Sequence, residues 1–432
     1  MKKTFTLFSL ILAFLLIATI CFAQTGVWEE LHPTNSPSPR CDFWMSEIGE
    51  GKAILFGGWG HDYVNYDETW IFDYRENTWT QINCNVHPSK RYDLRLARIT
   101  KNKVLLFGGL YESDYYNDTW IFDLDSLKWT EITPQKIPNR RRSHSLTQLS
   151  EGKVVLFGGD TIVANYASDT WIFDITTNNW KCLPITQFQP RPPECEGGMI
   201  APIDSGKILF YGGWDAGLLD ETWLLDYDET KWKKIEPISK SIPISNSSMV
   251  NINKKQVVFF GGHTSMGHDN DLWLFDLNDT TWKNINTTIR PGGRYRHSIV
   301  KIGTNKVLLF GGNELEVGHL YNDTWLFILL PNEVEENSQD NFKNQNSFLI
   351  QNDKARITTN FFGFCNYKLY DVYGKVLKEY SQAGAWEQER TGTWDQESSY
   401  IDLDVSDLTN GVYFLVVQCE KKTEVIRVLV AK

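Results

Sequence analysis

An aliphatic run that ends in two glycines recurs six times between residues 53 and 312. The copies read AILFGG, VLLFGG, VVLFGG, ILFYGG, VVFFGG and VLLFGG. Their first glycines are spaced by 51, 50, 54, 49 and 50 residues, at Gly57, Gly108, Gly158, Gly212, Gly261 and Gly311. A period near fifty residues indicates a stacked or radial array whose units bury their faces against one another.

Other residues recur in register with the two glycines. A first tryptophan follows them and begins a short strand such as TWIFDY, at Trp70, Trp120, Trp171, Trp223, Trp273 and Trp325. A second follows nine residues later in five copies, at Trp79, Trp129, Trp180, Trp232 and Trp282. An arginine precedes the first glycine by 17 residues in four copies, at Arg40, Arg91, Arg141 and Arg294. Arg191 is displaced to 21 residues, and the fifth copy has Ile244. Each unit is therefore predicted to contain four short antiparallel strands.

This combination of motifs resembles the kelch repeat over residues 27–330. The resemblance implies a β-propeller with one four-stranded sheet in each blade. We therefore predict an all-β chain, with a six-bladed kelch-type β-propeller over residues 24–331 and a small C-terminal β-sandwich over residues 348–432.

The sixth copy lacks its second tryptophan, since the residue nine positions after Trp325 is Val334. The segment GVWEELHPTNSPSPR near the N-terminus matches NTWTQINCNVHPSKR of the first copy, and Trp28 precedes Arg40 as Trp79 precedes Arg91. The strand around Trp28 is therefore predicted to be the fourth strand of the sixth blade. Such closure removes an open sheet edge.

The N-terminus reads as a secretory signal peptide over residues 1–23. Lys2 and Lys3 precede an apolar run, and Cys21-Phe22-Ala23 offers a cleavage site before Gln24. A membrane anchor is the alternative, but the run is short for a bilayer span. Lipid attachment at Cys21 is disfavoured because the bulky Ile20 precedes it.

The formal charge of −11 becomes −13 once the two lysines of the leader are removed. An acidic surface repels phosphate backbones, so nucleic acid is not an expected partner. No membrane span is expected in the mature chain, because no later segment is long and apolar enough.

Residues 332–347 are polar and are predicted to be a linker, and strand patterning resumes at residue 348. The C-terminal region resembles the type A sorting domain of the type IX secretion system of Bacteroidota, at Gly374, Leu408, Gly411, Tyr413 and the closing Val430-Ala431-Lys432. The resemblance implies that the secretion machinery is a partner and delivers the protein to the cell surface or the medium. Residues 381–399 are longer and more polar than is usual in that family. An immunoglobulin-like accessory domain is the alternative.

Six cysteines remain after removal of the leader, and none forms a C-x-x-C motif, so no metal site is expected. Disulfides are permitted in an exported protein. Cys182–Cys195 is the first candidate pair and Cys365–Cys419 the second, while free buried thiols remain equally compatible with the sequence.

The loops that follow the glycines combine aromatic rings with carboxylates and histidines, a composition suited to sugars or polar peptides. The predicted ligand-binding residues are Arg40, Arg91, Arg141, Arg191, Arg294, Trp59, Tyr111, Trp214, His263 and Asn313. The arginines have two interpretations: they brace turns through backbone carbonyls, or they line the channel and bind carboxylates.

The predicted function is an exported binding module for a glycan or a protein. The chain lacks the tyrosine, histidine and cysteine constellation of kelch-like copper oxidases, and no cofactor is expected. The alternative is a carbohydrate-active enzyme of the sialic acid mutarotase or epimerase type, with Glu314 and Glu316 as acid and base. His144 and His297 share one repeat position, which favours a structural role.

Overall fold

The computed structural model describes residues 26–163, 165–185, 188–285, 287, 289–314, 318–330, 347–350, 354–359, 365–370, 376–381, 399–408, 411–419 and 422–430. The predicted signal peptide lies outside these residues, as does the predicted linker except for residue 347. One compact unit spans Gly26–Leu329, and a second contains the chain from Leu330 onward.

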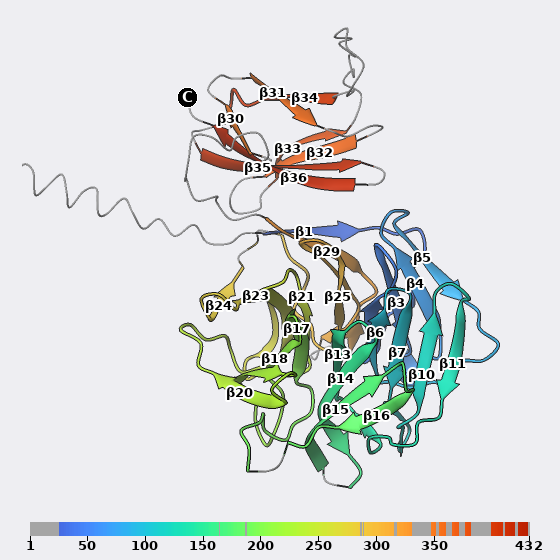
Figure 1. The fold of residues 1–432 in the computed structure, drawn as a ribbon. Coiled ribbons are helices and arrows are strands. Elements are labelled where there is room, and N and C mark those ends of the chain that lie inside the picture. The colour runs from blue at the N-terminus through green and yellow to red at the C-terminus, as the bar shows by residue number, and fades with distance from the viewer. Residues whose placement is uncertain are drawn as a thin grey trace, which may run out of the picture. The chain divides into compact units, whose positions relative to one another are not determined.

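The first unit is a β-propeller built from six sheets, which Figure 1 shows arranged about a common centre. The first sheet contains β2 (Trp44–Glu47), β3 (Lys52–Phe56), β4 (Thr69–Asp73) and β5 (Thr78–Ile82). The second contains β6 (Arg95–Thr100), β7 (Lys103–Phe107), β10 (Thr119–Asp123) and β11 (Lys128–Ile132). The third contains β12 (Arg141–Arg142), β13 (Ser145–Ser150), β14 (Lys153–Thr161), β15 (Asn165–Asp174) and β16 (Asn179–Cys182). The fourth and fifth comprise β17 (Met199–Asp204), β18 (Lys207–Tyr211), β19 (Thr222–Asp226) and β20 (Lys231–Ile235); and β21 (Ser248–Asn251), β22 (Gln256–Thr264), β23 (Gly267–Asp276) and β24 (Thr281–Asn284).

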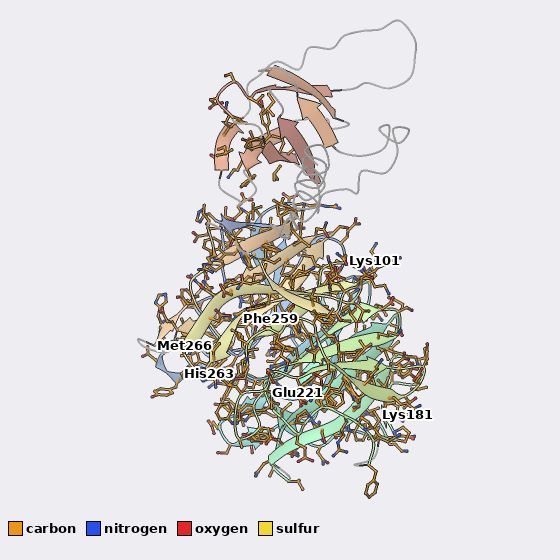
Figure 2. The ribbon with its side chains drawn as sticks, turned by 90° about the vertical axis from the view of Figure 1, so that its left-hand side faces the viewer. Lys101, Lys181, Glu221, Phe259, His263 and Met266 are labelled. Atoms are coloured by element: carbon orange, nitrogen blue, oxygen red, sulfur yellow. The ribbon has the colours of Figure 1, made fainter. Side chains whose placement is uncertain are left out.

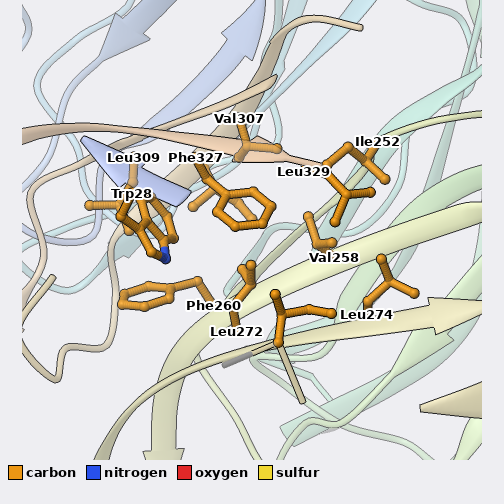
Figure 3. Packing of buried hydrophobic residues seen from close by; sticks show 12 residues of the cluster. Trp28, Ile252, Val258, Phe260, Leu272, Leu274, Val307, Leu309, Phe327 and Leu329 are labelled. Atoms are coloured by element: carbon orange, nitrogen blue, oxygen red, sulfur yellow. The ribbon is translucent and has the colours of Figure 1, made fainter. Parts of the chain in front are cut away.

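The sixth sheet combines strands from the two ends of the propeller. It contains β25 (Ser298–Gly303), β26 (Lys306–Phe310), β29 (Thr324–Leu329) and β1 (Gly26–Leu31). β1 pairs antiparallel with β29, with Trp28 opposite Phe327. The strand around Trp28 therefore occupies the position predicted for it from the repeat pattern. Its indole packs against Phe260 and Phe327 in a buried cluster between the fifth and sixth sheets (Figure 3).

The two glycines form the notch into which the next sheet docks. Gly57 and Gly58 have φ values of 73° and 105°, which residues with a Cβ rarely adopt. A Cβ at Gly57 would lie 2.6 Å from the carbonyl oxygen of Arg91, and the N–H of Gly58 donates to that same oxygen over 2.9 Å. The glycine pair is therefore required by a backbone contact between neighbouring sheets.

The second tryptophan of a repeat joins its sheet to the preceding one through a side-chain hydrogen bond. The indole N–H groups of Trp79, Trp129, Trp180, Trp232 and Trp282 donate to the hydroxyls of Thr324, Thr69, Thr119, Thr170 and Thr222. Trp28 makes no such bond, because Leu272 holds the matching position in β23. The indole of Trp28 is held by packing alone.

Four short strands and one turn of 3-10 helix lie in the loops of the propeller. They are β8 (Leu110–Tyr111), β9 (Asp114–Tyr115), β27 (Asn313–Glu314), β28 (His319–Leu320) and η1 (His61–Tyr63). No helix among the described residues is long and apolar enough to cross a membrane.

The second unit is also all β. A five-stranded sheet has the order β30 (Ser347–Ile350), β36 (Lys422–Val430), β35 (Gly411–Cys419), β32 (Cys365–Tyr370) and β33 (Val376–Ser381). β31 (Lys354–Thr359) and β34 (Ser399–Asp404) form a separate two-stranded sheet. The register places Cys365 opposite Cys419.

Cys182 and Cys195, the first candidate disulfide pair, are not joined, and the free-thiol alternative describes them. Both are free thiols, with Cys182 exposed at the end of β16 and Cys195 buried. Cys195 packs against Gly213, and burial raises the pKa of its thiol well above the usual range. Cys195 therefore has a structural role in the loop that leads into the fourth sheet.

Trp28→Ala is expected to lower the free energy of unfolding by about 3–5 kcal/mol, because it leaves a large cavity between two sheets. Chemical denaturation of the mature chain measures this. Trp59→Ala, at a half-buried loop tryptophan, serves as the control and should cost much less. Equal midpoints for Trp28→Ala and the wild type would contradict the assigned packing.

Thr119→Val is expected to cost about 1–3 kcal/mol, because it leaves the buried indole N–H of Trp180 without an acceptor at nearly constant volume. Thr130→Val, at an exposed position of β11, is the matched control and should change stability by less than about 0.5 kcal/mol. Thermal unfolding of both variants tests the contribution of the hydrogen bond.

Candidate functional site

A ring of six backbone hydrogen bonds lies where the innermost strands begin. Its members, which we call the axial ring, are Asp42, Asp93, Ser143, Gly197, Asn246 and Arg296. Each N–H donates to the carbonyl of the member before it, and Asp42 donates to Arg296, over distances of 2.8–3.1 Å. All six have φ between 48° and 64°. With one member from each sheet, the ring encircles the axis of the propeller, and we call the edge of the propeller at which it lies the mouth.

The side chains of the axial ring carry opposed charges. Arg296 contacts Asp42 over 3.2 Å, and Arg142 contacts Asp93 over the same distance. Arg142 also contacts Asp160 over 2.8 Å and Glu196 over 3.5 Å. Two guanidinium groups thus hold a cluster of carboxylates together at the mouth.

The pKa values of Asp42 and Asp93, the two buried aspartates of the axial ring, are shifted in opposite directions. Burial raises the pKa of Asp42 to about 7, and the neighbouring Asp93 adds to this despite the opposing charge of Arg296. Burial alone would raise the pKa of Asp93, but Arg296 and Arg142 outweigh it and lower that pKa. The pair therefore retains one proton to near-neutral pH.

Four of the predicted ligand-binding arginines are instead structural braces. Arg91 is buried, donates to the carbonyl of Gly108 over 3.2 Å, and binds both carboxylate oxygens of Asp118 over 2.6 and 2.8 Å. Its guanidinium lies over the ring of Tyr116. The same contacts with a glycine carbonyl and an acid recur at Arg40, Arg141 and Arg294. Their donors are used inside the fold, so the bracing interpretation fits them and the ligand-binding one does not.

Arg191 does not join this series of braces. It is half-buried and lies 3.7 Å from Glu194, while Cys195 supplies the backbone contact that the arginines make elsewhere. In the fifth sheet Ile244 makes that contact, and no brace forms there.

The remaining predicted residues surround the axial ring. The residue that follows a glycine pair forms an antiparallel β-bridge with the residue that precedes a member of the axial ring. These bridges pair Trp59 with Cys41, Trp214 with Glu196, His263 with Ser245 and Asn313 with Tyr295. Tyr111 lies one residue beyond the corresponding bridge of Leu110. The structure therefore brings these positions together at one mouth.

Aromatic rings gather beside Asn313. The ring of His268 stacks on Tyr295 with centroids 4.7 Å apart, and His263 lies 6.1 Å from both. Asn313 donates to the hydroxyl of Tyr295, whereas its own buried carbonyl oxygen has no partner in the described structure.

His144 and His297 are fully buried against Phe107 and Phe260. Burial lowers the pKa of both, so they are neutral core residues, but the structural hydrogen bonding expected from their shared repeat position is not found at the ring nitrogens of His144. No group of three or more metal-ligating side chains occurs in the part of the chain that the structure describes.

Sequence reasoning missed the charged residues of the axial ring, Asp42, Asp93 and Arg296, together with Arg142 and Glu196. The available signal was positional, since each lies one or two residues after the repeat arginine or its counterpart. Their residue types differ from copy to copy, so a search for recurring residues passes over them.

Comparison with known proteins identifies both units. The model of the KLHDC2/KLHL20/DRC7 Kelch-repeats domain matches residues 16–159, 49–259 and 152–347. The model of the secretion system C-terminal sorting domain matches residues 345–431.

An F-box/kelch-repeat protein of Arabidopsis thaliana is 30% identical over 89 residues, which are 20% of this chain and 18% of that protein. The dynein alpha chain of the flagellar outer arm of Chlamydomonas reinhardtii is 28% identical over 83 residues, 19% of this chain and 2% of that protein. The chain thus spans less than a fifth of either relative.

Arg91→Ala is expected to lower the free energy of unfolding by about 3–5 kcal/mol, because it leaves the carboxylate of Asp118 without its cation. Arg191→Ala, outside the braces, should change it by less than about 0.5 kcal/mol. Denaturant titration of the two variants makes the comparison, and similar losses in both would contradict the assignment.

The free energy of unfolding is expected to fall between about pH 4 and pH 7, the interval from the ordinary pKa of an aspartate to that of the folded Asp42. The folded state holds a proton on Asp42 that the unfolded chain releases near its ordinary pKa, so this stabilisation is lost as pH rises through about 7. Asp42→Asn cannot lose that proton and should flatten the profile. Denaturation midpoints at several pH values measure the difference, and an unchanged slope would contradict the shared proton.

Proposed function

This chain belongs to the kelch-repeat family and ends in a secretion system C-terminal sorting domain, and on that premise we propose that it is an exported binding module. Its ligand, a protein or a glycan, is held at the mouth around the axial ring. The signal peptide of residues 1–23 directs the chain across the inner membrane. The C-terminal domain then engages the type IX secretion machinery, which delivers the protein to the cell surface or the medium.

One observation carries the binding role. The position after each glycine pair has the same backbone contacts in every sheet, yet its residue varies among five types: Trp59, Leu110, Asp160, Trp214, His263 and Asn313. Residues that serve the scaffold, such as the bracing arginines of four sheets, recur because those sheets make the same contact. Variation on a constant backbone supports ligand recognition at this mouth.

The binding role is tested with the mature chain on glycan and peptide arrays. Trp214→Ala and Asn313→Ala, at the mouth, are expected to weaken binding of any retained ligand. Leu127→Ser, at an exposed turn between β10 and β11, is the control and should leave binding unchanged. Accelerated anomer exchange of free sialic acid, followed by NMR, would favour the mutarotase alternative.

Deletion of residues 345–432 is expected to trap a folded propeller in the periplasm, because the chain then lacks its sorting domain. Cell fractionation and immunoblotting measure its location. A variant that lacks residues 332–340 keeps the sorting domain and should be exported. Normal surface delivery of the chain without residues 345–432 would refute the sorting role.

A further inference from the structure

The loops that follow the glycine pairs are acidic without exception. These mouth loops, residues 59–68, 110–118, 160–169, 214–221, 263–271 and 313–323, contain 16 Asp and Glu residues and no Lys or Arg. The opposite ends of the same strands differ, because their acids are matched by cations. Next to the turns between first and second strands, Lys52, Lys103, Lys153, Lys207 and Lys255 pair with Asp73, Asp123, Asp174, Asp226 and Asp204. Antiparallel pairing places these turns away from the mouth. The charge asymmetry therefore belongs to one edge of the propeller.

The scaffold neutralises only part of this negative charge. Seven of the loop carboxylates have a cation within 4 Å: Glu68, Asp118, Asp160, Asp169, Glu221, Asp271 and Asp323. The others that the structure describes form no ion pair there: Asp62, Asp67, Glu112, Asp114, Asp215, Asp220, Asp269 and Glu314. A partner that supplies cations would meet little competition from the protein's own side chains.

The fifth sheet contains a carboxylate at a position where the first two sheets have a tyrosine. The backbone carbonyl of Asp269 accepts the same hydrogen bond that the carbonyls of Tyr66 and Tyr116 accept in the first two sheets. Ile244 replaces the bracing arginine here, and the nearby guanidinium of Arg290 pairs with Asp271 rather than with Asp269. One carboxylate oxygen of Asp269 is buried with no hydrogen-bond partner, and burial raises its pKa. Asn313 adds a second buried and unpartnered acceptor at the mouth.

Apolar side chains project from the same edge. β14–β15 and β22–β23 extend past their glycine pairs as hairpins on the third and fifth sheets. Ile162 and Val163 lie at the tip of the first and are 62% and 81% exposed. Met266, at the tip of the second, is 97% exposed and lies near His263 in Figure 2. The half-buried Trp214 belongs to the fourth sheet, which comes between the third and fifth sheets that carry the two hairpins.

We propose that the mouth between the two hairpins docks a cationic, partly apolar polypeptide segment, in which lysine or arginine alternates with aliphatic residues. The cations pair with Asp215, Asp220 and Asp269, and the aliphatic side chains cover Met266 and the tip of β14–β15. Exposed aliphatic side chains match a polypeptide better than a sugar, and unpaired carboxylates gain nothing from neutral hydroxyls beyond hydrogen bonds. This inference rests on the proposed function and narrows its ligand to one chemical class.

The test measures binding of a fluorescein-labelled peptide of alternating Lys and Leu to the mature chain by fluorescence anisotropy. Two matched peptides carry Glu in place of Lys or Ser in place of Leu. The Lys/Leu peptide is expected to bind about tenfold more tightly than either, with an affinity that falls as salt is added.

Matched variants locate the contact. The triple variant Asp215→Asn, Asp220→Asn, Asp269→Asn is expected to weaken binding at least about fivefold, and Met266→Ser about two- to fivefold. The control triple variant Glu76→Gln, Glu151→Gln, Glu229→Gln removes the same charge from exposed turns away from the mouth and should bind as the wild type does. Leu127→Ser is the control for Met266→Ser. Thermal unfolding confirms that every variant is folded.

The outcomes separate this inference from the proposed function. Equal losses in the two triple variants would show general attraction to an acidic protein and overturn the docking site. If the wild type binds a glycan, Trp214→Ala abolishes that binding, and the Lys/Leu peptide does not bind, the inference is overturned and the proposed function stands. Absence of binding to every peptide and glycan would overturn both.

Discussion

The backbone contact at each glycine pair is the interaction on which the rest of the propeller depends. The end of a second strand meets the loop that enters the next sheet, and the N–H of Gly58 reaches the carbonyl of Arg91 there. The same loop continues for two residues into the axial ring. The spacing from arginine to glycine, the brace and the ring are thus consequences of one close approach. A side chain at Gly57 would separate two sheets and displace a member of the ring.

The fifth sheet departs from the pattern at several linked positions. It has Ile244 for the bracing arginine, Asp269 for the tyrosine and Leu272 for the threonine that accepts an indole N–H. Its acid Asp271 pairs with Arg290, and the indole N–H of Trp273 has no hydrogen-bond partner in the described structure. These changes replace polar contacts by packing in the fifth sheet, and they leave polar groups at the mouth uncommitted. Loss of one brace therefore has a consequence for the surface as well as for the core.

The scaffold and the mouth place different demands on the sequence. A contact that recurs from sheet to sheet selects the same residue in the copies that make it, as at the second tryptophan and the four bracing arginines. A contact with a ligand has no such symmetry, because an ordinary ligand lacks the symmetry of the propeller. Both effects occur in the residues of the axial ring. Their backbone hydrogen bonds are the same in every sheet, whereas their side chains differ and include two aspartates, a serine, an asparagine and an arginine.

The sequence by itself determined the all-β class, the strand pattern of each repeat and the partner of β29, because the diglycine and tryptophan contacts recur at fixed spacing. It also indicated a C-terminal sorting domain, which the family model matches over residues 345–431. Only the tertiary structure decided between the two roles of Arg91, since burial against Gly108 and Asp118 is not visible in spacing. It alone brought Asp42, Asp93 and Arg296 together, although up to 254 residues separate them. Nonrepeating side chains from distant copies meet only where the sheets converge, so local patterns do not reveal them.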